Sequence, residues 1–524
     1  LELYYLWVGD HAGAEWVVAT LQKLTSSIDV PPLARITGKI VEAVYQVRMA
    51  RHDLCLRTIA EGLEIAHSTG ILVWNSQLFS QGVANALNAG DAAGAEIYLQ
   101  KMASTLVESR RVDACMYHYN IAWAAMLQED PARALRYAES ALRFAKEAGT
   151  PLHQGLCHLA LAQVLHARGE RQSAVPHLTE ARRIATAMHS RILEFMYLLL
   201  QAEFAFDTDD ERAGLVALHA ALTLGKEQGY VNFYWWRPKV MSRLCAKALE
   251  AGLEMDYVQG VIRRRKLTPD PAFLYSDQWP WAIKIHALGH FSIIKDGRPI
   301  QSGVKAQRKP LDLLQALIAL GGRDVPETQL SDLLWPDAAG DAAHRVFLTT
   351  LQRLRQLLGY KEALVLADGR LTLDSRYAWV DISAFDHLLN QAEAAEREGR
   401  SEAACHLRIK ALSLYRGHFS GQDTAPAVSL RERLRDKYLR HSEALGRYWE
   451  QTGDWPRALE CYLKALEVDD LAEVFYQRLM VVYQHLDRRA DALAAYERCG
   501  KTLAAALGIK PSAASQALYR ALTK

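Results

Sequence analysis

The spacing of hydrophobic residues divides the chain into three parts. Apolar residues recur at helical intervals up to about Gly260, and again from Asp381 to Lys524. Between these parts, from Ile283, apolar and polar residues alternate as in a half-buried strand before helical spacing returns. We therefore predict a mainly α protein with a central α+β part.

The first part of the chain is repetitive. Turn-forming pairs recur about every 40 residues, at Gly90-Asp91, Glu129-Asp130, Gly169-Glu170 and Asp209-Asp210. Each pair precedes a helix with an alanine near its start, at Ala95, Ala134, Ala174 and Ala213. Helix pairs at a fixed period are typical of an α-solenoid, in which each pair buries its apolar face on the next. We predict a TPR-like solenoid over residues 1–262, with an effector or a partner protein at its surface.

Two segments of this region have more than one interpretation. The aromatic run Tyr230–Trp236 either packs the last repeats and fastens the linker, or lines an effector pocket. The basic run Arg263–Lys266 either contacts phosphate or forms a solvated helix end that suits the helix dipole. Because prolines follow the basic run, we predict a linker over residues 263–281.

Residues 282–382 have the order of parts of a winged helix, a fold that places one helix in a DNA groove. After the alternating stretch, helices are expected at about 307–320, 327–334 and 342–358. A hairpin follows at 363–366 and 370–373, and its turn is Asp368-Gly369, a strong hairpin dipeptide.

The third of these helices carries the candidate contacts. Phe347, Leu351, Leu354 and Leu358 share one face and must be core, and Asp341 is a suitable N-cap. The opposite face holds Arg345, Thr349, Gln352 and Gln356, with Leu348 and Arg353 at its edges. This helix has no acidic residue from 344 to 358, and its side chains can offer donors to guanine, amides to adenine and carbon to a thymine methyl. The alternative is a solvated face that lacks acids.

Other cations suit the DNA backbone. Lys305, Arg308 and Lys309 cluster at the start of the first helix, where they would contact phosphate without reading sequence. Arg370, at the hairpin turn, either reaches the minor groove or a phosphate, or is an ordinary hairpin cation. Trp335, between the second and third helices, is expected to fill the core.

The last part, residues 383–524, has the period of tetratricopeptide repeats. Gly453 and Asp487 are 34 residues apart, as are Ala458 and Ala492. Residues 398–412 look like a third copy. We predict a TPR-like helical domain here.

Composition excludes several classes of protein. With 62 basic and 60 acidic residues the net charge is only +2, so any DNA contact must come from a local patch. The seven cysteines have no metal or disulfide spacing and the chain has no long apolar run, so we expect a cytoplasmic protein without membrane spans or bound metal.

We expect no enzyme activity and no cofactor, because catalytic motifs are missing. Gly500-Lys501-Thr502 is not a phosphate loop, because Ala495 stands where a glycine is required.

Residues 282–524 resemble activators of the antibiotic-regulatory-protein (SARP) type, which join a response-regulator-like winged helix to a bacterial transcriptional activator domain. The elements LWP, RLRQLLG, GDWPRAL and LGIKPS carry the resemblance and occur in that order. It implies an activator that binds double-stranded promoter DNA as side-by-side copies on repeated sites and recruits RNA polymerase. By matching positions, Arg345, Thr349, Gln352 and Arg353 become major-groove or adjacent phosphate contacts, and Arg355 a phosphate contact. The hairpin departs from many relatives, because Gly369-Arg370-Leu371 replaces Gly-Tyr-Arg.

The preceding repeats resemble, in period and layout, the sensor solenoid of the maltose-activator (MalT-like) signalling ATPases. That resemblance implies a nucleotide-binding domain, which we expect upstream of Leu1 if it exists, because we interpret the chain as a fragment of a longer protein. The sequence thus favours a transcription activator controlled by a solenoid. The near-zero net charge keeps a second hypothesis open, a helical-repeat scaffold that uses its winged helix to dock proteins.

Overall fold

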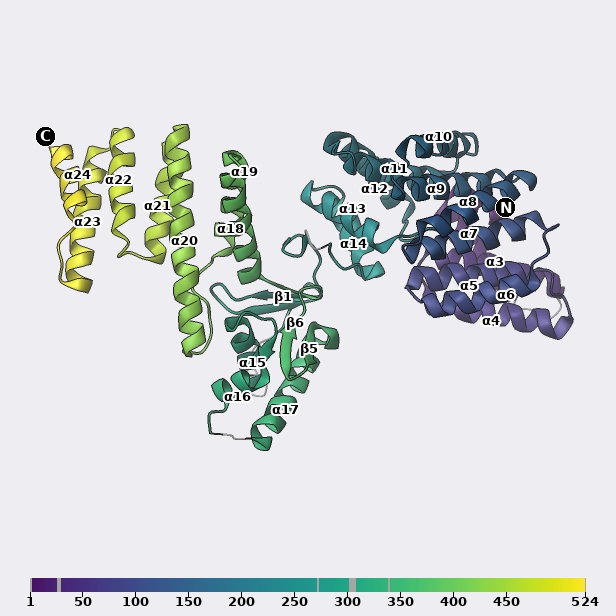
Figure 1. Ribbon diagram of the computed structural model, residues 1–524, viewed down its shortest axis with the longest axis horizontal. Coiled ribbons are helices and arrows are strands. Elements are labelled where there is room, and N and C mark those ends of the chain that lie inside the picture. Colours follow the sequence, from purple (N-terminus) through teal and green to yellow (C-terminus); the bar gives the residue numbers. More distant parts are fainter. Residues whose placement is uncertain (1, 26–29, 271–272, 301–307, 338–339, 524) are drawn as a thin grey trace. The chain divides into compact units, whose positions relative to one another are not determined.

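The computed structural model describes residues 2–25, 30–270, 273–300, 308–337 and 340–523. The protein is mainly helical and consists of two compact units, Leu1–Asp270 and Pro271–Lys524 (Figure 1). Each unit is described by itself.

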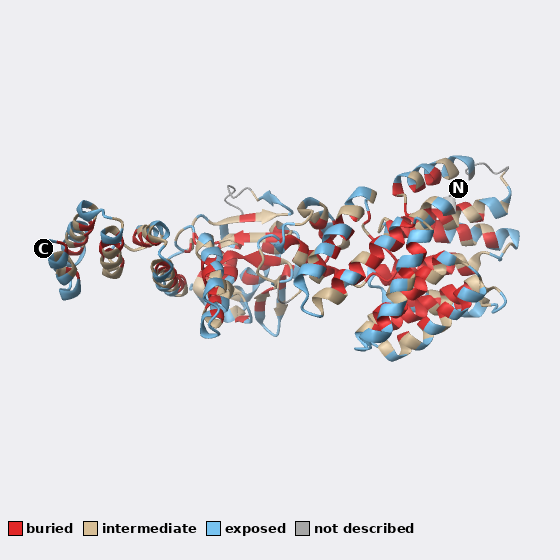
Figure 2. Ribbon diagram, turned by 90° about the horizontal axis from the view of Figure 1, so that it is seen from above, coloured by how far each residue is buried: buried red, intermediate tan, exposed pale blue. Residues whose placement is uncertain are grey.

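The first unit is a series of antiparallel helices, each packed on its neighbours in the chain. Its helices are α1 (Glu2–Val8), α2 (His11–Thr25), α3 (Pro32–Arg48), α4 (His52–Thr69), α5 (Asn75–Ala89), α6 (Ala92–Thr105), α7 (Arg111–Leu127), α8 (Pro131–Glu147), α9 (Pro151–Ala167), α10 (Arg171–Ala187), α11 (Arg191–Phe206), α12 (Glu211–Gln228), α13 (Pro238–Glu250) and α14 (Met255–Arg265). Buried residues, red in Figure 2, line the helix faces that meet in the interior of the unit. This arrangement confirms the predicted TPR-like solenoid.

The predicted turns begin every second helix. Asp91, Asp130 and Asp210 are N-caps whose side chains accept the backbone N–H three residues ahead. Such a cap contributes about 1 kcal/mol and fixes where the helix starts.

The alanines after the turns are buried in three of the four repeats. Ala95, Ala134 and Ala174 are at most 2% exposed, which lets two helices approach closely. In the fourth repeat, Ala213 faces solvent. Gly214 takes the buried position instead, because a Cβ there would meet the ring of Phe206.

The aromatic run Tyr230–Trp236 is a buried strap that reaches far beyond the last repeats. The hydroxyl of Tyr230 donates to the carbonyl of Gly9, and the amide of Asn232 donates to the carbonyl of Val47 at 2.7 Å. Tyr234 bonds to Gln81 at 2.9 Å, and the indole N–H of Trp123 donates to Trp236 O at 3.4 Å. The run therefore ties early and middle repeats together, and it also lines a cavity.

The basic run Arg263–Lys266 ends α14, and both interpretations of it are wrong for Arg265. Its guanidinium donates to the carbonyl of Asn88 at 2.8 Å and lies 4.5 Å from the ring centre of Trp236. Burial lowers the pKa of Arg265 to about 10. Arg265 is thus a clamp between α14, the end of α5 and the aromatic strap.

Replacing Arg265 with methionine should lower the stability of the first unit by about 2 kcal/mol, since the substitution removes a charge-assisted hydrogen bond and a cation–π interaction. For a unit of this size we expect the thermal midpoint to fall by about 4–8 °C, measured by scanning calorimetry. Arg263→Met is the matched control from the same run, because Arg263 is exposed. Equal effects of the two changes would contradict the clamp.

The second unit begins with the winged helix. One sheet has the order β3-β2-β1-β7, with β1 (Ile283–His286) antiparallel to β2 (Ser292–Lys295) and parallel to β7 (Ala378–Val380), and β3 (Arg298–Pro299) at the edge. The other has the order β4-β6-β5, from β4 (Val325–Pro326), β6 (Arg370–Leu373) and β5 (Leu364–Ala367). The helices are α15 (Arg308–Ala319), α16 (Glu327–Leu334) and α17 (Asp341–Leu358), with a 3-10 turn at Lys361–Ala363.

This order of elements confirms the predicted winged helix, with one local correction. The predicted start of the first helix at 307 lies outside the described residues. Asp341 is the first residue of α17 and not its N-cap, because Gly340 takes that position with φ 55°. The hairpin turn is as expected: Asp368 and Gly369 have φ of 49° and 68°, which a tight two-residue turn requires.

The remaining helices form TPR-like pairs. They are α18 (Asp381–Arg397), α19 (Ser401–Leu414), α20 (Ala425–Thr452), α21 (Trp455–Val468), α22 (Glu473–His485), α23 (Arg489–Leu507) and α24 (Ala513–Thr523). Gly399, Gly453 and Asp487 have positive φ at the turns, and the alanine five residues after each is fully buried. The three predicted copies are therefore present. Gly500-Lys501-Thr502 lies inside α23, as expected.

The winged helix and the first C-terminal helices share one core. It runs from Ile283 in β1 to Tyr438 in α20 and includes Phe347 and Phe385. The carboxylate of Asp381, at the start of α18, accepts the N–H groups of Ala287 and Leu288 at 2.8–2.9 Å. The sequence predicts that the winged helix ends at residue 382 and the C-terminal helical domain begins at 383. In the structure this boundary falls inside α18.

The segment predicted as a linker is largely packed. The carbonyl of Thr268 accepts from Ser242 at 2.6 Å within the first unit. In the second unit, Trp379 donates to the carbonyl of Tyr275 at 3.1 Å, and Trp281 is 4% exposed. The two units therefore meet in the chain at residues 270 and 271.

Candidate nucleic-acid interface

Helix α17 has one buried and one exposed face. Phe347, Leu351, Leu354 and Leu358 are at most 1% exposed and hold the helix on the winged-helix core. The exposed side chains on the other side define the recognition face, which consists of Arg345, Leu348, Thr349, Gln352, Arg353 and Gln356. The structure therefore places on one helix face the four residues of this helix that the sequence predicts as DNA contacts there or at its edges: Arg345, Thr349, Gln352 and Arg353. Figure 1 shows α17 at the surface of the second unit, beside the β5–β6 hairpin.

The side chains of the two arginines of the recognition face have no protein partner among the described residues. Within the described part of the chain, the guanidinium groups of Arg345 and Arg353 make no ion pair and no hydrogen bond to protein. Two other exposed arginines of this unit form ion pairs: Arg376 with Asp374, and Arg400 with Glu398. Guanidinium groups without a protein partner suit a ligand that supplies anionic or acceptor groups.

The rest of the recognition face offers mixed chemistry. The hydroxyl of Thr349 donates to the carbonyl of Arg345 at 2.8 Å, which leaves its oxygen as an acceptor. Leu348 is 38% exposed and Val346 40%, so carbon is available beside the polar groups.

Arg355 lies away from the recognition face. Its Nε and Nη2 both donate to the carbonyl of Leu364, at 3.2 and 2.7 Å. It therefore anchors the start of the hairpin on α17, and a phosphate contact by this residue stays a prediction.

The hairpin, or wing, is tied to the two helices before it. The N–H of Glu327, at the start of α16, donates to the carbonyl of Gly369 at 2.8 Å. The carboxylate of Glu327 is hydrogen-bonded to His344 of α17 at 2.5 Å. These bonds hold the wing turn in a fixed position relative to the start of α17.

Arg370 is exposed at the wing and donates to the carbonyl of Asp324 at 2.9 Å. Arg323, whose side chain is 85% exposed, adds a second cation beside the wing. The sequence interpretation missed Arg323, because only the pairing of β4 with β6 brings residues 323–326 next to the hairpin.

Of the predicted phosphate contacts at the start of the first helix, Arg308 and Lys309 are the first two residues of α15. Lys305 lies outside the described residues, and Arg308 is exposed. Lys309 donates to the carbonyl of Leu334 at 3.4 Å and lies 5.9 Å from the ring centre of Trp335. Trp335 is half-buried against the winged-helix core, so it only partly fills the core as predicted.

Comparison with known proteins supports the same part of the chain. Residues 380–523 match the bacterial transcriptional activator domain. The match begins at the last residue of β7 and covers helices α18–α24.

Several curated regulators are similar to the chain. Regulatory protein AfsR of Streptomyces griseus is 27% identical over 231 residues, which are 44% of this chain and 23% of that protein. Transcriptional regulatory protein EmbR of Mycobacterium tuberculosis is 29% identical over 251 residues, or 44% of this chain and 61% of that protein. Regulatory protein DnrI of Streptomyces peucetius is 26% identical over 237 residues, or 41% of this chain and 84% of that protein. The chain spans about a quarter of the length of the AfsR relatives.

Among solved structures, Mycobacterium tuberculosis EmbR in complex with a low affinity phosphopeptide is 23% identical, with a TM-score of 0.39, and covers 47% of this chain and 65% of that one. Together, the domain match and the relatives support a bacterial transcriptional regulator of the SARP type. The likeness of the first unit to MalT-like sensors stays a prediction.

The described residues contain no group of three or more His, Cys, Asp or Glu side chains that could hold a metal ion. Six of the seven cysteines are buried thiols and Cys461 is half-buried. Of the helices in the described ranges, none is long and apolar enough to span a bilayer.

Proposed function

We propose that this chain regulates transcription, and that it activates promoters by binding double-stranded DNA through α17. The observation that carries this proposal is the recognition face, where Arg345 and Arg353 are exposed and uncommitted on a helix without acids between residues 344 and 358. A winged helix inserts such a helix into the major groove and sets its wing against the neighbouring minor groove or backbone.

Each kind of side chain on the recognition face has a partner in the groove. The arginines are suited to the O6 and N7 atoms of guanine or to flanking phosphates, and Gln352 and Gln356 to adenine. Leu348 offers carbon to a thymine methyl. Arg308, Arg370 and Arg323 are placed to neutralise phosphates, which positions the protein without reading sequence.

The C-terminal helices supply the protein contacts in this proposal. Because α18–α20 share a core with the winged helix, they are fixed relative to the bound DNA. We propose that surfaces of these helices contact RNA polymerase and a second copy on repeated sites, and that the first unit receives the controlling signal. A cytoplasmic location is part of the same proposal.

The proposed function predicts selective, salt-sensitive binding to a few promoter fragments from the source genome. Phosphate contacts release counterions, so affinity should fall about 10³-fold or more between 50 and 200 mM salt if about six phosphates are neutralised. Fluorescence anisotropy of the full chain on labelled fragments measures both effects. Flat anisotropy at low salt would contradict the proposal and favour a scaffold that uses the winged helix to dock proteins.

A further inference from the structure

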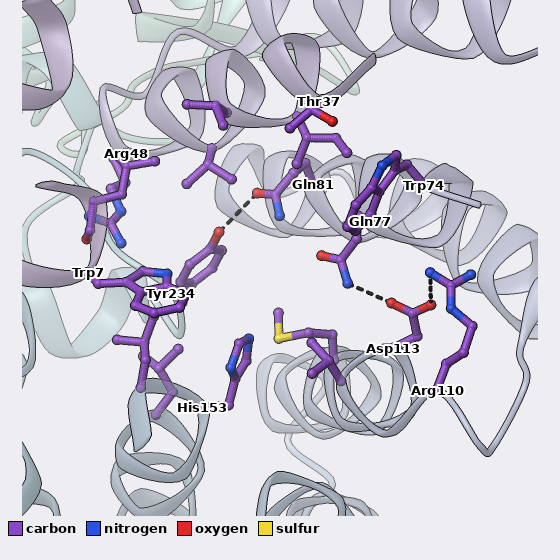
Figure 3. Close-up of a pocket in the computed structure, with 18 of the residues that line it drawn as sticks. Trp7, Thr37, Arg48, Trp74, Gln77, Gln81, Arg110, Asp113, His153 and Tyr234 are labelled. Carbon is purple, nitrogen blue, oxygen red and sulfur yellow. Dashed lines mark hydrogen bonds and ion pairs between the residues drawn. The ribbon is translucent and has the colours of Figure 1, made fainter. Parts of the chain in front are cut away.

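The first unit contains a cavity of about 690 Å³, which has no role in the DNA binding proposed for the second unit. Its wall comes from α1, α3, α5, α7, α9 and the aromatic strap (Figure 3). Apolar side chains, among them Val41, Val44, Met116 and Leu156, make up much of this wall. A cavity of this size takes a ligand of drug-like dimensions.

A buried cation stands at one side of the cavity. Arg48 is 5% exposed and ends the stripe of α3 that faces the cavity, after Thr37, Val41 and Val44. One of its N–H groups donates to the carbonyl of Leu6, whereas no ion pair joins Arg48 to any described carboxylate. Burial lowers the pKa of Arg48, yet an arginine remains charged at neutral pH.

An unpaired buried charge is unfavourable, and buried cations normally have an anionic partner. A single carbonyl uses one of five guanidinium donors. The arrangement therefore leaves Arg48 with donors and a charge that the described protein groups do not satisfy.

The carboxylate of Asp113, which also lines the cavity, already has partners. Asp113 accepts from the amide of Gln77 at 2.7 Å and pairs with Arg110 at 2.9 Å. Figure 3 shows this cluster on the side of the cavity opposite Arg48. The anion that Arg48 lacks must come from elsewhere.

Between these two sides the cavity offers neutral polar groups. Burial lowers the pKa of His153 to about 4, so its imidazole is uncharged at pH 7, and its Nδ1 is buried without a partner. Tyr234 lies near Arg48 in Figure 3, and its hydroxyl is hydrogen-bonded to Gln81 at 2.9 Å.

We propose that this cavity binds an amphiphilic acid, whose carboxylate pairs with Arg48 and whose apolar body packs against α3, α7 and α9. Bidentate recognition of a carboxylate by a guanidinium provides direction as well as charge. A free aliphatic or aromatic acid and the C-terminus of a short apolar peptide share this chemistry. The proposal concerns ligand binding by the first unit and does not depend on DNA binding.

The test is displacement of 1-anilinonaphthalene-8-sulfonate from the full chain, followed by its fluorescence. Competitors are decanoate, indole-3-propionate and a Leu/Phe tetrapeptide with a free C-terminus, each compared with its neutral amide. One charge-assisted contact predicts that an acid competes at least about tenfold more strongly than its amide. The acid that shows this preference identifies the source of the carboxylate.

Arg48→Met should remove the preference for the acid and should leave the thermal midpoint equal or higher, since an unpaired buried charge is replaced by an apolar side chain of similar length. Arg136→Met, on the exposed side of α8, is the control and should keep the preference. If Arg48→Met does not fold, Arg48→Lys decides, because a point charge without the guanidinium fork should reduce the preference several-fold. Equal competition by acid and amide in the wild type, or a preference that survives both substitutions, overturns the proposal.

Discussion

Replacing both Arg345 and Arg353 with alanine is expected to weaken binding to promoter DNA at least about 30-fold. Each guanidinium contributes about 1–3 kcal/mol, whether it reads guanine or pairs with phosphate. Neither group has another partner in the described part of the chain, so its removal costs the folded protein little. Anisotropy titrations at several salt concentrations measure the affinity and its salt slope, which should become shallower by about one for each phosphate that the variant no longer neutralises.

Arg489→Ala/Arg520→Ala is the matched control for that double variant. It removes the same charge from exposed positions on α23 and α24 and should leave affinity within about twofold. Arg345→Lys/Arg353→Lys separates the two kinds of contact, since lysine keeps the phosphate attraction and loses bidentate base recognition. Unchanged binding and an unchanged slope in the alanine variant would exclude α17 as the reading helix.

Replacing Asp381 with alanine should destabilise the second unit by about 3 kcal/mol or more. Its carboxylate accepts the N–H groups of Ala287, Leu288 and Ile382, and these amides would lose their acceptor in a buried site. Each unsatisfied buried amide costs about 1–3 kcal/mol. Burial raises the pKa of Asp381 to about 6, so at pH 7.5 the carboxylate is ionised in both the folded and the unfolded chain.

Scanning calorimetry at pH 7.5 should show the transition of the second unit about 6–12 °C lower, and hydrogen exchange should speed up in β1 and α18. Asp386→Ala is the control on the same helix. Asp386 forms a half-exposed ion pair with Lys437 at 2.6 Å, and such pairs contribute at most about 1 kcal/mol. A destabilisation no larger than that of the control would mean that Asp381 does not hold the two segments together.

Features with local signals were predictable from the sequence. The turn residues before each helix act on N–H groups three positions ahead, so Asp91 and Asp130 mark helix starts without knowledge of the fold. The hairpin turn at Asp368-Gly369 depends on the backbone preferences of two adjacent residues. The recognition face followed from helical spacing alone.

Features that depend on distant segments were not predictable. Arg265 looked like a solvated end, but its partner Asn88 is 177 residues earlier in the chain. The bond from Arg355 to the carbonyl of Leu364 was likewise not predictable, because the sheet places that carbonyl. A signal for Arg48 does exist, since it ends an apolar stripe of α3, but only the three-dimensional structure shows that it is buried without an ion pair to a described carboxylate.

The shared core has a practical consequence for exchanging parts between regulators. A graft of residues 282–382 would cut α18 after its second residue and would leave out Phe385, Phe419 and Leu434, which complete the core. It would also drop Tyr275, whose carbonyl binds Trp379. We therefore expect the transferable unit to be the winged helix together with α18–α20, residues 273–452, and hybrids joined after residue 382 should misfold rather than change their promoter.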